Sequence, residues 1–174
     1  MSNLNESTFA EQPVIDWLRE LGYEIQASKD LIPGGAFMER NDYSEVVLEG
    51  RLRRAIKRIN PNILDDALDE VAKKIIKFNH QDIELGNKEM YEMLTRGIVV
   101  DVKDEHSETR GKTIYPIDFK NLQNNEFLVV NQFTVQGKTV RIPDLVVFLN
   151  GIPIAIFELK SPTRENAIIA DAYG

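Results

Sequence analysis

Cysteine is absent from the sequence, which excludes disulfides and cysteine-ligated zinc sites. The two histidines, His80 and His106, stand alone without an HxH or HxxxH partner, so we assign neither to a metal. No apolar run approaches the ~20 residues that a membrane span needs, and the polar, acidic start is unlike a secretion signal. We therefore expect a cytoplasmic protein with no membrane partner, because reducing conditions suit a chain without cysteine.

Positive charge is scarce as well, with 21 Lys and Arg against 28 Asp and Glu and a net charge of −7. A domain that binds nucleic acid by itself is usually basic, so this balance argues against one. A nuclease stays open, because a metal site needs clustered acids and the grip on phosphate can come from a local basic face or another domain. The 174 residues, 43% hydrophobic and 28% charged, are typical of one soluble globular domain with its own core.

Two short apolar runs near the C-terminus, residues 145–149 and 152–157, flank the pair Asn150-Gly151. Both runs are rich in Val, Ile, Leu and Phe, which predicts strands buried on both faces. Asn-Gly between such runs predicts a hairpin, because both residues tolerate positive φ.

Three ionisable residues stand at the ends of this hairpin: Asp144 before the first strand, and Glu158 and Lys160 after the second. A charge beside a buried strand is costly unless it has a partner or a function. One interpretation is a structural ion pair at the edge of the sheet. The other is a divalent-metal site, in which two carboxylates hold Mg²⁺ and the lysine positions a water for attack on phosphorus.

Pro143-Asp144, followed 14 positions later by Glu158 of Glu158-Leu159-Lys160, matches the PD-(D/E)xK nuclease motif. The whole stretch RIPDLVVFLNGIPIAIFELKSP resembles the nuclease core of the restriction (R) subunit of type I restriction–modification enzymes. Further strings resemble the same family: RLRRAIKRINP, LTRGIVVDV and NEFLVVNQFTV. The resemblance extends over nearly the whole chain but only over the N-terminal part of the family protein.

The resemblance implies an α/β fold with a restriction-endonuclease-like core, a mixed β-sheet flanked by helices. We expect a single domain over residues 1–174, with a helical part at about 6–96 and a sheet and catalytic part at about 98–174. Hydrophobic periodicity predicts helices at 44–59, 63–78 and 87–96 and strands at 98–102, 113–118 and 125–135.

The activity that the resemblance implies is Mg²⁺-dependent hydrolysis of a DNA phosphodiester, with Mn²⁺ able to substitute. Asp144 and Glu158 would ligate the metal together with the Leu159 carbonyl, and Glu11 would complete the acidic cluster. Lys160 would steer the attacking water or stabilise the developing charge.

Glu11 lies in a predicted helix over residues 6–21, three positions after Thr8. From the residues alone, the two form a capping box, or Glu11 is a favourable charge near the helix N-terminus. In the family a helix glutamate joins the metal site, and Glu11 is the matching position, with Glu6 as the fallback. We expect Trp17 in the core rather than on a nucleotide-stacking surface.

A second candidate surface is the basic segment Arg51, Arg54, Lys57 and Arg58, the densest positive charge in an acidic chain. These residues either contact the DNA backbone or form a solvated helix face with glutamate partners four positions away. Gln132 points at the site or satisfies backbone groups, and we favour the second role.

The family protein is much longer than this chain and carries DEAD-box-like translocase domains after the nuclease. No GxxxxGK[ST] pattern occurs here, so ATP is expected to act only through those domains. The resemblance implies double-stranded DNA as substrate and the modification and specificity subunits as partners, with the isolated domain cutting weakly or not at all. A helix Gln–Tyr pair of the family is expected beyond Gly174.

Two other functions remain open. The first is a repair or junction nuclease on the same fold, which the resemblance outside the motif disfavours. The second is a non-catalytic docking domain with a vestigial site, which the joint presence of Asp144, Glu158 and Lys160 disfavours.

The hairpin places a geometric demand on any shared metal. A plain two-residue loop pairs Leu149 with Ile152 and puts Asp144 and Glu158 on opposite faces of the sheet. We therefore expect a loop of another length or a bulge at a ladder break, with both carboxylates on one face beside Lys160.

Overall fold

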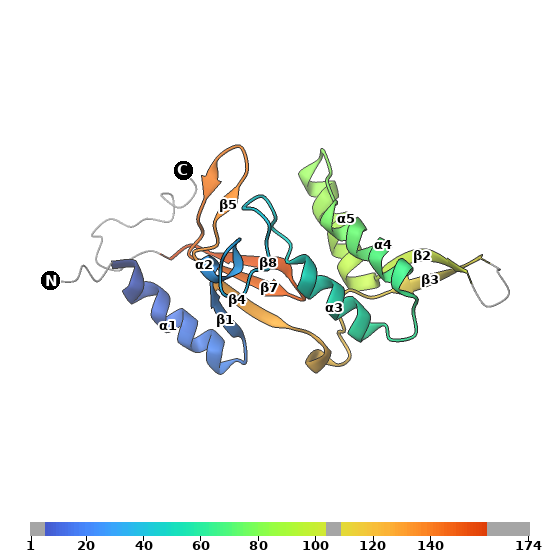
Figure 1. The fold of residues 1–174 in the computed structure, drawn as a ribbon, viewed down its shortest axis with the longest axis horizontal. Helices are drawn as coiled ribbons and strands as arrows, with labels where there is room; N and C mark the ends of the chain where they lie inside the picture. The colour runs from blue at the N-terminus through green and yellow to red at the C-terminus, as the bar shows by residue number, and fades with distance from the viewer. Residues whose placement is uncertain (1–5, 104–108, 160–174) are drawn as a thin grey trace. The chain divides into compact units, whose positions relative to one another are not determined.

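The computed structural model describes residues 6–103 and 109–159 (Figure 1). The chain divides into two compact units. The first contains the residues up to Val46, Phe127–Phe148 and the residues from Pro153, and the second contains Val47–Glu126 and Leu149–Ile152. Within the described part of the chain, no helix is long and apolar enough to cross a membrane.

The first unit is built on a four-stranded sheet with the order β1-β4-β7-β8. Its strands are β1 (Glu24–Ala27), β4 (Phe127–Asn131), β7 (Leu145–Leu149) and β8 (Ile152–Phe157). β1 runs parallel to β4, whereas β7 runs antiparallel to β4, since the Gln132 N–H beyond the end of β4 donates to the Asp144 carbonyl before β7 at 2.9 Å. This mixed α/β sheet flanked by helices confirms the predicted fold class.

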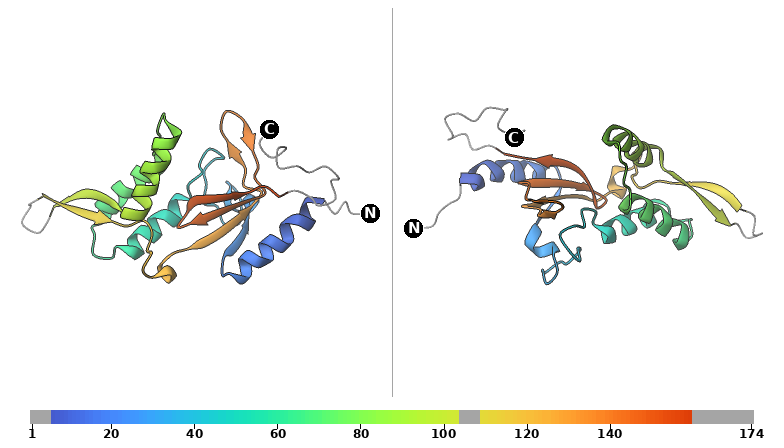
Figure 2. Two further views of the ribbon diagram at one scale, coloured as in Figure 1. Left: turned by 180° about the vertical axis from the view of Figure 1, so that it is seen from behind. Right: turned by 90° about the horizontal axis from the view of Figure 1, so that it is seen from above.

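Helix α1 (Glu6–Glu20) lies alongside this sheet, as the views of Figures 1 and 2 show. Ile15 and Leu18 on its inner face pack against Val129 of β4 and against β7, as the apolar stripe at helical spacing predicts. Trp17 is 55% exposed, so the prediction that it lies in the core is wrong. Its position, one residue before Leu18, turns it about 100° away from the buried stripe.

The remaining elements of the first unit are short. They are α2 (Ser28–Leu31), β5 (Val135–Gln136) and β6 (Val140–Arg141). β5 and β6 form a small antiparallel ribbon between β4 and β7 in the sequence.

The second unit packs three helices with a two-stranded antiparallel hairpin. Its elements are α3 (Glu49–Ile59), α4 (Asp65–Ile76), α5 (Ile83–Arg96), β2 (Ile98–Lys103), β3 (Thr109–Ile114) and the 3₁₀ turn η1 (Leu122–Asn124). Their core is aliphatic and includes Leu52, Ile56, Leu68, Val71, Ile75, Ile98, Val100 and Ile114. The amphipathic patterns therefore predict all three helices correctly, with α5 beginning four residues earlier than expected.

Helix α3 begins at Glu49 rather than at residue 44. The cause is tertiary, because the N–H of the fully buried Leu48 donates to the carbonyl of Gly151 at 2.8 Å. A residue bonded in this way cannot also continue a helix toward its N-terminus.

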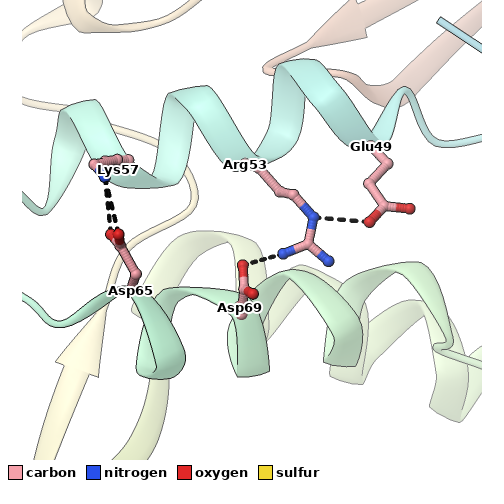
Figure 3. A network of polar contacts seen from close by, with 5 residues as sticks. All are labelled: Glu49, Arg53, Lys57, Asp65 and Asp69. Atoms are coloured by element: carbon pink, nitrogen blue, oxygen red, sulfur yellow. Dashed lines mark hydrogen bonds and ion pairs between the residues drawn. The ribbon is translucent and has the colours of Figure 1, made fainter.

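Charged side chains line the contact between α3 and α4 (Figure 3). Arg53 donates to Glu49, four residues earlier, at 2.7 Å and also contacts Asp69 of α4. Lys57 bonds Asp65 at 2.9 Å. Since exposed ion pairs each contribute only ~0–1 kcal/mol, the aliphatic core rather than this network holds the two helices together.

The β7–β8 loop contains only two residues, Asn150 with φ 53° and Gly151 with φ 80°. Two positive φ values in succession are typical of a type I′ turn, so the expectation of a loop of another length is wrong. Phe157 and Leu159, however, pack against the cluster that contains Leu145 and Val147.

That packing joins odd-numbered residues of both arms of the hairpin. An unbroken ladder closed by this two-residue loop would place odd residues of β7 beside even residues of β8. Phe157 is the last residue of β8 and Leu159 lies beyond it, where strand alternation no longer holds, so a bulge within the hairpin and a shared face for Asp144 and Glu158 stay predictions.

The side chain of Asn150 is fully buried and makes three hydrogen bonds. Its Nδ2 donates to the Pro116 carbonyl at 2.9 Å and to Asn125 Oδ1 at 2.8 Å, and its Oδ1 accepts from the Glu126 N–H at 2.7 Å. This residue therefore supplies both the positive φ of the turn and the partners of buried polar groups around it.

We predict that Asn150→Ala lowers the free energy of unfolding by about 2–4 kcal/mol, because buried partners lose their hydrogen bonds. Urea unfolding of the chain measures the change. Asn62→Ala, at an exposed asparagine of the same unit, is the control and should change stability by no more than ~0.5 kcal/mol. Equal effects of the two substitutions would contradict this role for Asn150.

Candidate metal site

Glu11 on α1 is buried, with 7% of the residue exposed. Two side-chain amides hold it: Asn131 Nδ2 donates to Oε2 at 3.3 Å and Gln132 Nε2 donates to Oε1 at 3.0 Å. Asn131 is the last residue of β4, two positions after Val129, and strand alternation puts both on the face that packs against α1. The fold therefore presents an amide to the inner side of the helix where Glu11 lies.

Burial raises the pKa of Glu11, and the nearby negative charge of Asp144 raises that pKa further. The two amide hydrogen bonds act in the opposite direction and lower it. Two carboxylates thus lie close enough to repel each other at a poorly solvated position. A cation bound between them would remove that repulsion.

Asp144 is half-buried and is tied to both neighbouring strands. Its Oδ2 accepts a hydrogen bond from the Leu159 N–H at 2.6 Å, and its backbone carbonyl accepts from the Gln132 N–H at 2.9 Å. The first bond brings Leu159 of the Glu158-Leu159 pair to the carboxylate of the PD motif. The second makes Gln132 a common neighbour of Asp144 and Glu11.

The other predicted site residues are placed less completely. Glu158 is exposed, and Lys160 lies outside the described residues. Among the residues that the structure describes, no group of three or more His, Cys, Asp or Glu side chains is placed to hold a metal. Ligation by Glu158 and by the Leu159 carbonyl therefore stays a prediction.

Glu11 and Asp144 nevertheless suit a hard divalent cation. Mg²⁺ prefers oxygen ligands, keeps several waters and is commonly bound through only one or two carboxylates. From the described residues, each Glu11 oxygen accepts one amide hydrogen bond, which leaves further lone pairs for a ligand bond. The donor set thus fits Mg²⁺ or Mn²⁺.

The sequence interpretation missed the partners of Glu11. Helix α1 begins at Glu6, so Thr8 is not the residue that precedes the helix, as the predicted capping box requires. The sequence favours a backbone-satisfying role for Gln132, but its side-chain amide donates to Glu11 instead. The available signal was the pair Asn131-Gln132 directly after an apolar strand, where polar side chains gather at the end of a sheet.

The basic segment on α3 lies in the second unit and is largely engaged there. Arg51 is buried and lies 3.6 Å from Glu126, which Arg58 also contacts at 3.0 Å. Because its guanidinium is buried, Arg51 does not present a charge to a phosphate, and that part of the DNA-contact prediction does not fit the structure. DNA contact by Arg54, Lys57 and Arg58 stays a prediction.

We predict that Glu11→Gln becomes more stable relative to the unmodified chain as pH rises. The pKa of Glu11 is raised in the folded chain, so protonated Glu11 stabilises the fold at pH values below its unfolded pKa of about 4.5. That stabilisation is lost as pH rises through the folded pKa. The neutral glutamine has no such loss. Urea unfolding from pH 4 to 8 in a chelator measures the difference.

The control is Glu20→Gln, at an exposed glutamate of the same helix. The stability difference between Glu20→Gln and the unmodified chain should change little over this range, because the Glu20 side chain faces water in the folded and in the unfolded chain. A flat Glu11→Gln difference from pH 4 to 8 would show that Glu11 is not destabilised by its charge.

The model of the family described as "Type I restriction enzyme R protein N terminus" matches residues 3–174. The "Putative type I restriction enzyme MjaIXP endonuclease subunit" of Methanocaldococcus jannaschii is 39% identical over 99% of this chain. The "Type I restriction enzyme HindI endonuclease subunit" of Haemophilus influenzae is 34% identical over 98% of it. The aligned region is 16% of the length of each relative.

Proposed function

From the finding that the chain belongs to the family of type I restriction enzyme R protein N termini, we propose that it is a nuclease domain that hydrolyses DNA phosphodiester bonds with Mg²⁺. Two named relatives are endonuclease subunits, which supports the nuclease assignment. Mn²⁺ would substitute for Mg²⁺, because both accept oxygen ligands in octahedral sites.

One observation carries this proposal. A buried glutamate, Glu11, is held by two amides beside Asp144, the aspartate of the PD motif. A purely structural role would pair such a carboxylate with a cation, yet among the described residues the charged group that shifts the pKa of Glu11 is another carboxylate, Asp144. Carboxylates held together despite repulsion are typical of sites whose function needs a cation between them.

Each residue has a distinct role in this proposal. Asp144 and Glu11 bind the metal, and Glu158 with the Leu159 carbonyl extends the same ligand set from the end of β8. A metal held by these residues would supply Lewis-acid chemistry, polarising the phosphoryl oxygens and lowering the pKa of an attacking water. Lys160 places its ammonium beside that water and the developing negative charge.

The wider activity belongs to a longer protein. The chain corresponds to 16% of the length of the two relatives named above, so we assign ATP-driven translocation to segments outside it. The proposed partners are double-stranded DNA and the modification and specificity subunits of the restriction complex. Cleavage by the isolated domain would be weak, because binding to DNA would come largely from the rest of the assembly.

We predict that Lys160→Ala, in a full-length subunit assembled with its partner subunits, lowers DNA cleavage by at least ~100-fold. ATP hydrolysis and translocation should continue, because the substitution leaves the translocase unchanged. Removal of one group that stabilises charge in a transition state typically costs this much in rate. The control is Lys138→Ala, at an exposed lysine of the same unit. Cleavage at the wild-type rate by Lys160→Ala would make Lys160 structural.

We also predict that Mg²⁺ stabilises the chain against thermal unfolding. At a concentration one hundred times its dissociation constant, the gain is about 2.7 kcal/mol. Asp144→Asn should lose most of this gain, while without metal at neutral pH it should melt above the wild-type chain because repulsion with Glu11 is gone. Differential scanning calorimetry with and without Mg²⁺ measures both effects.

Two results would oppose the metal site. The first is a wild-type melting temperature that does not respond to Mg²⁺, which would favour a non-catalytic docking domain. The second is a metal-free Asp144→Asn variant that melts below the wild-type chain, which would favour a structural ion pair at Asp144.

A further inference from the structure

Arg40 is the largest fully buried side chain among the described residues, with 1% of its surface exposed. Its guanidinium donates to two backbone carbonyls. Nη1 and Nη2 both lie 3.0 Å from the Thr134 oxygen, and Nη2 lies 2.9 Å from the Tyr43 oxygen. Burying a charged group is costly, so a side chain in this position needs a strong structural or functional reason.

The same guanidinium lies over an aromatic ring. Its carbon is 4.0 Å from the centroid of Phe133, which is itself 1% exposed. Phe133 in turn packs edge-on against Phe148 of β7, with ring centroids 5.0 Å apart. Arg40 therefore fixes the backbone of Thr134 and the side chain of Phe133, two consecutive residues.

Gln132 directly precedes these two residues and has a φ of 55°, in the left-handed region. A non-glycine residue occupies this region at a cost, typically ~1 kcal/mol or more, and holds it only where neighbours impose it. In this conformation Gln132 donates its N–H to the Asp144 carbonyl and its side-chain amide to Glu11. It is thus the shared contact of both carboxylate residues.

We propose that Arg40 is a positioning residue for the metal site. By clamping Phe133-Thr134 it holds Gln132 in its left-handed conformation, and Gln132 then keeps Glu11 and Asp144 at the separation that binds a divalent cation. Arg40 itself does not touch the metal or the DNA. This inference rests on the proposed metal site and adds a residue outside the PD-(D/E)xK motif.

A purely structural Arg40 would make a different prediction. It would lower stability when removed but leave the metal affinity of the molecules that remain folded unchanged. The test must therefore separate affinity from stability. Arg51 offers a matched control, because it too is a buried arginine, with 6% of the residue exposed. It lies in the second unit, beside Glu126.

The experiment titrates Mn²⁺ by calorimetry into the chain, without ATP, at a temperature where every variant is folded by circular dichroism. Heat that Asp144→Asn abolishes defines binding at this site. Arg40→Met should weaken Mn²⁺ binding by about 10- to 100-fold, as loss of a group that orients ligands typically does. Arg51→Met should bind within about twofold of wild type, even where its melting temperature falls.

Arg40→Lys gives a second variant if the methionine variant does not fold. Lysine restores a donor to the Thr134 carbonyl but not the planar stacking on Phe133, so binding should weaken to an intermediate degree. Wild-type affinity in folded Arg40→Met or Arg40→Lys would overturn the positioning role while leaving the metal site intact. Absence of any Mn²⁺ heat in the wild-type chain would instead overturn the proposed function.

Discussion

The first unit depends on one constraint, the placement of a buried carboxylate next to another acid. Glu11 is held by amide N–H groups of Asn131 and Gln132, while Asp144 raises its pKa further than burial alone would. Amides are suitable partners because they stabilise the negative charge without neutralising it. Unlike a lysine or arginine partner, these amides add no positive charge that would compete with a bound cation.

The surrounding fold can be understood from this constraint. Helix α1 must lie against the end of β4, and its apolar contacts with Val129 secure that position. Directly after β4 the chain passes through Gln132 in a left-handed conformation. Arg40 bonds the carbonyl of Thr134 and lies over the ring of Phe133, the two residues that follow Gln132.

The sequence predicts the elements well where the signal is local. Apolar periodicity finds the helices, and Asn150-Gly151 marks the turn, because a two-residue loop with two positive φ values is a local requirement. Tertiary contacts were not predictable in the same way. The bond from Leu48 shortens a helix, and Trp17 lies outside the stripe that packs on the sheet. The amide partners of Glu11 come from a strand some 120 positions later, which no periodicity reveals.

The most direct test of the account is to locate the metal. Anomalous X-ray scattering from crystals of the chain grown with Mn²⁺ shows where the ion binds. The account predicts an anomalous peak at coordination distance from the carboxylates of both Asp144 and Glu11, with the Gln132 amide still bonded to Glu11. An ordered chain with no peak beside these carboxylates, or with peaks only elsewhere, would contradict it.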